Sequence, residues 1–208
     1  MNKLTVYNVD DNSFSKVEEP DPSANYTYAD YLKWKFEEQL ELIRGKVFRM
    51  SPAPAPDHQK ISLAIAGIFY RKLRKSNCQA FPAPFDVRLP VKNRKKDDEI
   101  TTVVQPDFCV ICDDSKIDSR GCLGPPDLIV EILSPGNSAK DVKLKFDVYE
   151  KAAVKEYWIV YPVEETIAVF VLGKGKYNGA TLYAGKDTLH SQAVPGLTVN
   201  VKEIFRKK

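Results

Sequence analysis

One apolar run with a carboxylate inside it constrains the fold of this chain more than any other feature. Residues 127–134, DLIVEILS, have the near-continuous apolar character of a strand that is covered on both faces. Glu131 interrupts the run, with three apolar residues before it and two after it. An unpaired buried charge is strongly unfavourable, so this residue should be paired or should bind a cation. A position at a solvent-facing strand end is the remaining alternative.

The segment after this strand predicts an amphipathic helix with a lysine on its apolar side. The helix should begin near Ala139, after a break at Gly136-Asn137 and with Ser138 as its N-cap. With Val142 at zero and about 100° per residue, the apolar residues occupy one arc of the helix. Lys145 falls near about 300°, inside that arc, and is therefore aimed at the sheet. The alternative is that its stem packs on the protein while its amine reaches water.

A second carboxylate, Asp107, begins another strand-like run. Pro106 before it marks the start of a strand, because proline cannot donate to a ladder. Asp127 also follows a proline, but it lies on the same strand as Glu131, about 13 Å away at about 3.3 Å per residue. One ion cannot bridge that span, whereas Asp107 on a neighbouring strand can come closer. A turn role for Asp107 stays open, since aspartate is common at turns.

Two acids on neighbouring strands and one inward lysine are suited to phosphodiester hydrolysis. Paired carboxylates can bind Mg²⁺ through oxygen ligands. The ion can position and activate a water and take up negative charge at phosphorus. A lysine can stabilise the developing charge or orient the water. Asp107, Glu131 and Lys145 are therefore the candidate site.

The remaining patterns predict a mixed β-sheet flanked by helices, an α/β (α+β) fold. Helical spacing marks residues 29–40 and 56–75. Residues 41–52 read as a hairpin with Arg44-Gly45 at its turn. Further strand-like segments occupy 84–91, 101–112, 156–162 and 166–172, followed by short strands and a last short helix.

Composition and charge exclude little. The 208 residues fit one domain, and the net charge of +3 is too small by itself to indicate nucleic acid. Basic runs at 92–96 and 206–208 read as a solvated loop and a chain end. No apolar run is long enough to cross a bilayer and the N-terminus lacks a signal-peptide core. A cytoplasmic location without a membrane partner is therefore expected.

The four cysteines are expected to be reduced thiols in the core. Cys109 and Cys112 form a C-x-x-C, a spacing also found in zinc sites. They lie in a strand-like run, however, where residues three apart point to opposite faces. The arrangement therefore argues against zinc.

Several of these segments together resemble the Uma2 family, within the PD-(D/E)XK restriction-endonuclease-like superfamily. The resemblance runs from about residue 28 to 172 and rests most on the block 125–162, PPDLIVEILSPGNSAKDVKLKFDVYEKAAVKEYWIVYP. It implies a restriction-endonuclease-like mixed β-sheet flanked by helices. Residues 1–25 are then expected as a loosely ordered segment and residues 26–208 as a single nuclease domain.

The resemblance assigns roles to the candidate residues. Pro106-Asp107 matches the PD element, and Glu131 matches the acid of the (D/E)-x-K element. Leu133 stands where that element usually has its lysine, and Lys145 matches a relocated lysine of the family. The helical positions worked out above select Lys145 independently.

Two further residues become candidates by the same resemblance. Glu41 in ELIRGK matches an additional acid near the site and is expected to be catalytic with the other three. His58 in PDHQKI matches a recurring histidine, for which a capping or core role is an equal alternative.

The function implied by the resemblance is a metal-dependent endonuclease that hydrolyses phosphodiester bonds, with DNA as the expected substrate. Asp107 and Glu131 would hold Mg²⁺ or Mn²⁺, and the chain could act as a homodimer. A catalytically inactive protein of the same fold that binds nucleic acid or protein is the first alternative, because fold does not fix function. A structural homo-oligomer in which Glu131 and Lys145 simply pair is the second.

Overall fold

The computed structural model describes residues 3–8, 13–18, 21–34, 40–50, 55–92, 94–134 and 139–205. The chain forms two compact units, one of residues 1–50 and 89–104 and one of residues 51–88 and 105–208. The predicted break at Gly136-Asn137, the predicted cap Ser138 and the basic end 206–208 lie outside the described residues.

The first unit is built on the predicted hairpin. Strands β3 (Leu40–Ile43) and β4 (Lys46–Arg49) pair antiparallel, and β7 (Val103–Val104) pairs with β3. Arg44 and Gly45 join the two hairpin strands with φ values of 52° and 79°. Positive φ at both central residues is what a two-residue type I′ turn requires. The sequence prediction of this hairpin is confirmed.

The beginning of the chain differs from the prediction. Strands β1 (Lys3–Asn8) and β2 (Ser13–Glu18) pair antiparallel within the segment expected to be loosely ordered. The helix predicted over 29–40 is wrong at its end, because α1 spans only Tyr28–Tyr31. Leu40 belongs to β3, where it is buried and paired in the sheet. Tertiary pairing there overrides the helical spacing of the sequence.

The second unit contains the main sheet. In its described part, the strand order is β14-β13-β12-β11-β8-β5, with β15 also paired to β13. The strands span Gln79–Pro82 (β5), Phe108–Ile111 (β8), Leu128–Ile132 (β11), Glu156–Tyr161 (β12), Thr166–Gly173 (β13), Lys176–Tyr177 (β14) and Thr181–Ala184 (β15). β11 and β12 run parallel, whereas β8 is antiparallel to β11. The mixed sheet predicted from the sequence is confirmed.

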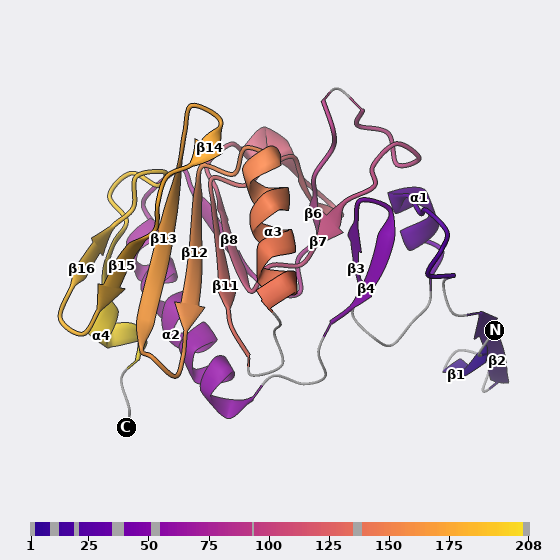
Figure 1. The fold of residues 1–208 in the computed structure, drawn as a ribbon, viewed down its shortest axis with the longest axis horizontal. Helices are drawn as coiled ribbons and strands as arrows, with labels where there is room; N and C mark the ends of the chain where they lie inside the picture. The colour runs from indigo at the N-terminus through magenta and orange to yellow at the C-terminus, as the bar shows by residue number, and fades with distance from the viewer. Residues whose placement is uncertain are drawn as a thin grey trace. The chain divides into compact units, whose positions relative to one another are not determined.

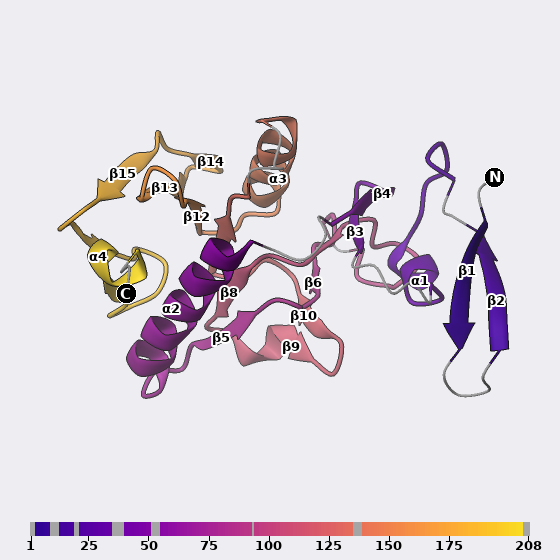
Figure 2. The same cartoon turned by 90° about the horizontal axis from the view of Figure 1, so that it is seen from below.

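Two helices cover opposite faces of this sheet (Figures 1 and 2). Helix α2 (Pro56–Leu73) packs through Phe69, whose ring makes edge contacts with Phe108 and Trp158. Helix α3 (Ala139–Lys151) connects β11 to β12 and packs through Phe146 and Tyr149. Because side chains alternate along a strand, even-numbered residues of β11 face α2 and odd-numbered ones face α3. Glu131 is therefore on the α3 face.

Short elements complete the second unit. They are β6 (Val87–Arg88), η1 (Asp114–Lys116), β9 (Ile117–Asp118), β10 (Gly121–Leu123), β16 (Thr188–His190), β17 (Thr198–Asn200) and α4 (Val201–Ile204). Arg88 is buried and pairs with Asp118 at 2.6 Å. β6 is shorter than the strand-like segment predicted over 84–91.

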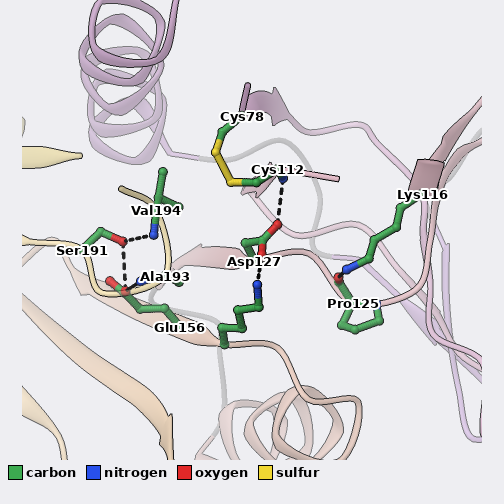
Figure 3. Close-up of polar contacts among 10 residues, drawn as sticks. Cys78, Cys112, Lys116, Pro125, Asp127, Glu156, Ser191, Ala193 and Val194 are labelled. Carbon is green, nitrogen blue, oxygen red and sulfur yellow. Dashed lines mark hydrogen bonds and ion pairs between the residues drawn. A yellow bond between two sulfur atoms is a disulfide. The ribbon is translucent and has the colours of Figure 1, made fainter. Parts of the chain in front are cut away.

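A buried carboxylate ties the C-terminal segment to the sheet. Glu156 is fully buried and accepts hydrogen bonds from the Trp158 indole N–H (2.6 Å) and the Ser191 hydroxyl (2.9 Å). The backbone N–H groups of Gln192 and Ala193 also donate to it, at 2.7 and 2.8 Å. Figure 3 shows Glu156 reaching toward Ser191 and Ala193. Four hydrogen bonds to one carboxylate can compensate for its removal from water.

The expectation that all four cysteines are reduced thiols is wrong for two of them. Cys78 and Cys112 form a disulfide, so these two are not reduced thiols. Cys109 and Cys122 are buried and free, and burial raises the pKa of both thiols. Cys109 and Cys112 therefore do not act together as a metal pair.

None of the described helices is both long enough and apolar enough to cross a bilayer.

Candidate active site

The register of β8 and β11 places the two predicted acids opposite each other. Ile129 pairs with Cys109, and Val130 pairs with Phe108. Asp107 directly precedes β8, so extending this register by one step would set it against Glu131. Directly opposed residues of an antiparallel pair have Cβ atoms about 4.5–5.5 Å apart and share a face. The backbone N–H of Ile132 donates to Asp107 Oδ2 at 2.7 Å, which holds the aspartate against β11.

Glu131 receives two donors from α3. Lys145 Nζ lies 2.9 Å from Glu131 Oε1, and the Tyr149 hydroxyl donates to the same oxygen at 2.6 Å. The two donors are four residues apart, so they lie on one face of the helix. The lysine selected by the helical wheel is thus the one that reaches the buried acid.

Asp107 is also contacted by the first turn of α2. His58 Nε2 lies 3.2 Å from Asp107 Oδ1, and the histidine side chain is 10% exposed. The hydrogen bond to Asp107 raises the pKa of His58 above its usual value, while burial opposes the rise. The Ile132 backbone also raises the pKa of His58. His58 Nδ1 is buried and makes no hydrogen bond of ordinary geometry within the described residues.

A second lysine–carboxylate pair lies at the opposite end of β11. Asp127 accepts from Lys155 Nζ at 2.6 Å and from the Cys112 backbone N–H at 2.7 Å. Figure 3 shows Asp127 directed at Cys112, whose sulfur is bonded to Cys78. At about 3.3 Å per residue, Asp127 is about 13 Å from Glu131 along the strand. This pair is therefore separate from the candidate site and resembles it in chemistry.

Two further predictions concern Glu41 and a basic cluster. Glu41 is buried on β3 of the first unit, opposite Phe48, while the other three candidates belong to the second unit. For a DNA substrate, either the loop 92–96 or the basic residues Arg71, Lys72, Arg74 and Lys75 are expected to line the approach to the site, and Arg71 to Lys75 lie at the other end of α2 from His58. A separation of 13 helical residues corresponds to about 20 Å. These basic residues therefore do not line the site.

A cavity of about 300 Å³ adjoins His58. Its wall includes the segments that follow the parallel strands, Leu133-Ser134 after β11 and Pro162–Glu164 after β12, together with Tyr161. The beginning of α2 closes another side through Ala55, Asp57 and His58. Figure 1 shows the carboxyl ends of β11 and β12 at the same edge as the beginning of α2. In α/β sheets, ligands bind preferentially outside the carboxyl ends of parallel strands.

The donor set fits a hard divalent cation. No group of three or more His, Cys, Asp or Glu side chains gathers for a metal within the described residues. Mg²⁺ is usually held by only one or two carboxylates, with waters and substrate oxygens completing its shell. Asp107 and Glu131 supply two carboxylates on one face at a strand end. Each oxygen of Asp107 has one partner, His58 or the Ile132 N–H, and a second lone pair for a cation, whereas Oε1 of Glu131 already accepts from two donors.

Comparison with known proteins shows the family to which the chain belongs. Residues 28–202 match the family Uma2, described as "Putative restriction endonuclease". The chain belongs to the Uma2 family. The resemblance of the sequence to Uma2 is thereby confirmed, and the match extends about 30 residues beyond 172, through the C-terminal strands.

Two relatives of this Uma2 chain cover most of its length. An uncharacterized protein, slr1290, from Synechocystis sp. is 24% identical over 180 residues, which are 85% of this chain and 90% of that protein. A crystal structure from Anabaena variabilis, described as a putative nuclease belonging to DUF820, has a TM-score of 0.66 and 21% identity. It covers 86% of this chain and 97% of the other. The predicted fold class is confirmed by that likeness.

Sequence reasoning missed one residue of the candidate site. Tyr149 counted only as part of the apolar arc of the helix, yet its hydroxyl binds Glu131. The signal was available, because Tyr149 follows Lys145 by four residues and so shares its face.

Proposed function

We propose that this Uma2 protein is a metal-dependent endonuclease that hydrolyses phosphodiester bonds in DNA. One observation carries the proposal: Asp107, directly before β8, accepts from the backbone N–H of Ile132, the neighbour of Glu131 on β11, and Lys145 reaches Glu131 from the helix that follows. The membership in a family described as restriction endonucleases supports the same chemistry. Asp107 and Glu131 would hold Mg²⁺ or Mn²⁺.

Each residue of the site has a task in this proposal. When bound, the cation supplies a Lewis acid for the phosphate and for the attacking water. The Lys145 amine lies beside Glu131, where it can donate to a phosphate oxygen as negative charge develops. The Tyr149 hydroxyl donates to the same oxygen of Glu131 and helps to hold the carboxylate in place. Ile132 N–H and His58 hold the two oxygens of Asp107 in place, as second partners of metal ligands commonly do.

Nicking of a supercoiled plasmid in Mg²⁺ tests the proposal. Asp107→Asn and Glu131→Gln should reduce the rate to background, and Lys145→Met should reduce it by about 10²–10³-fold, as for loss of a charge-stabilising group. Lys155→Met is the matched control, because it breaks the other lysine–carboxylate pair on β11 and should leave the rate unchanged.

Two results would decide against the proposal. Equal nicking by the wild type and Asp107→Asn would place the activity elsewhere. A wild type that nicks no DNA and shows no stabilisation by Mg²⁺ would favour a binding protein with the same fold. Glu41→Gln, in the first unit, is a separate test of the fourth predicted residue, and a loss of nicking with unchanged stability would assign it to catalysis.

A further inference from the structure

From the cavity beside the candidate site we infer that the substrate inserts an unpaired nucleobase there, next to the bond that is cleaved. The inference rests on the proposed function and deepens it, because it names the part of the DNA that this cavity receives. It is carried by where the cavity lies, how large it is and what lines it.

The cavity is within one nucleotide of the candidate site. Leu133 lies directly after β11 and two residues after Glu131, at most about 7 Å away at the rise of an extended chain. His58 belongs both to the cavity wall and to the contact with Asp107. A strand of DNA whose phosphate sits between the two acids therefore has a neighbouring base within reach of the cavity.

The cavity also matches a base in size. Its volume of about 300 Å³ is at the lower end of small-molecule pockets, which span roughly 300–1,000 Å³. One flat ring system fits such a space, whereas a base pair does not. The base must therefore leave its stack, as in enzymes that flip a nucleotide or act on single strands.

The lining favours a base over a phosphate. Tyr161 lies on the α3 face of β12, two residues beyond Ile159, which pairs with Glu131. Tyr161 is half-buried, and Val163 at the rim is 85% exposed. An aromatic ring and exposed apolar groups form the kind of surface on which bases stack.

The charge of the cavity lining also indicates which bases it would bind. Asp57 and Glu164 line the cavity, and none of the described lining residues is a lysine or an arginine. Carboxylates repel a phosphate but accept hydrogen bonds from exocyclic amino groups, such as N4 of cytosine and N6 of adenine. Thymine has no such group. The cavity should therefore prefer cytosine or adenine to thymine.

Binding of labelled 12-mers by fluorescence anisotropy, with Ca²⁺ in place of Mg²⁺, tests this inference. The probes are single-stranded dC12, dA12 and dT12, and a 12-mer in which every sugar lacks its base. Tyr161→Ala should weaken dC12 about tenfold, the size expected for loss of one stacked base, and should not change binding of the abasic 12-mer. Tyr161→Phe should bind dC12 as the wild type does. Tyr70→Ala is the matched control, because Tyr70 is 74% exposed on α2.

Two further variants keep the test independent of folding at Tyr161. Val163→Ser should weaken dC12 about threefold without altering the melting temperature, because its side chain is largely exposed. Glu164→Gln should reduce the preference for dC12 over dT12.

Loss of affinity for the abasic 12-mer equal to that for dC12, or unchanged dC12 binding by Tyr161→Ala and Val163→Ser, would overturn the inference. If these variants behave so while the wild type nicks plasmid, only the base pocket is wrong. If the wild type binds none of the probes at low salt and nicks no plasmid, the proposed function fails as well.

Discussion

At the scale of single residues, one carboxylate oxygen of the site accepts from two side chains. Glu131 Oε1 receives both the Lys145 amine and the Tyr149 hydroxyl. Asp107 directly precedes β8 and has His58 and the Ile132 N–H as partners. Two carboxylates that share one site repel each other unless a cation lies between them. The site should therefore be less stable empty than filled.

Asp107→Asn tests that repulsion. The free energy of unfolding without metal should stay within about 1 kcal/mol of the wild type or rise, because asparagine can still accept from the Ile132 N–H. Mg²⁺ at a hundredfold excess over its Kd should stabilise the wild type by about 2.7 kcal/mol and the variant far less. Urea unfolding with and without Mg²⁺ measures both. The control Asp127→Asn should keep the full Mg²⁺ response, and a response equally lost there would remove Asp107 from the metal site.

Lys145→Met removes the ammonium from Glu131. The pair is largely buried, with side chains 19% and 11% exposed, and Tyr149 still donates to the glutamate. The free energy of unfolding should therefore fall by about 2 kcal/mol in metal-free buffer, less than for a fully stranded charge. Mg²⁺ should recover part of this loss, because a cation replaces the missing charge.

Urea unfolding with and without Mg²⁺ measures Lys145→Met, and Lys155→Met under the same conditions provides the comparison. Lys155 is 63% exposed, so its loss should cost about 1 kcal/mol or less and should not respond to Mg²⁺. A large loss in Lys145→Met together with no effect of Mg²⁺ on the wild type would identify Glu131 and Lys145 as a purely structural pair.

Some of the buried charged residues could be predicted from the sequence, and others could not. Glu131 stood out because a charge inside an apolar run is rare, and the helical period alone aimed Lys145 at the sheet. Glu156 gave no such signal, since it begins its strand beside a lysine, although it is fully buried. Its partners at Ser191 to Ala193 are more than 30 residues away in the chain and become neighbours only in the folded structure.

At the scale of secondary-structure elements, α2 joins the core to the site. Its first turn supplies His58, and its middle and last turns supply the buried side chains Ile65, Phe69 and Leu73. The predicted apolar stripe of this helix is confirmed, because a period of 3.6 residues is a strong signal over 18 residues. The helix predicted over 29–40 failed for the opposite reason: its pattern was short, and Leu40 gained a place in a strand.

Phe69→Ala and Leu63→Ala compare the two faces of α2. Phe69 is fully buried and its ring contacts Phe108 and Trp158, so its truncation should lower the free energy of unfolding by about 4 kcal/mol. Leu63 is 75% exposed, and its truncation should change that free energy by less than about 0.5 kcal/mol. Urea denaturation distinguishes them, and similar losses in both variants would contradict the packing of α2 on the sheet.

At the scale of the whole molecule, a disulfide closes a long loop. It joins Cys78, just after α2, to Cys112, just after β8, across 34 positions of the sequence. Sequence alone could not pair them, because four cysteines allow three pairings and none marks itself as free. The structure leaves Cys109 and Cys122 as buried thiols.

Thiol titration checks the pairing directly. Unfolded protein without reductant should react as two thiols, and reduced protein as four. Cys112→Ser should lower the free energy of unfolding by about 3–4 kcal/mol, the loop-closure contribution for a loop of this length. Cys122→Ser is the control that leaves the disulfide intact, and four reactive thiols before reduction would show that the bond does not form.

The register of β8 against β11 limits how such a site can change during evolution. Loss or gain of one residue beside Asp107 would turn its side chain to the other face of the sheet, away from Glu131. Each acid is therefore tied to its position in the chain. The lysine is not, since a long side chain can reach the same oxygen from a different element. With Leu133 on the strand and Lys145 on the helix, the amine could migrate between secondary-structure elements while the two carboxylates stayed in place.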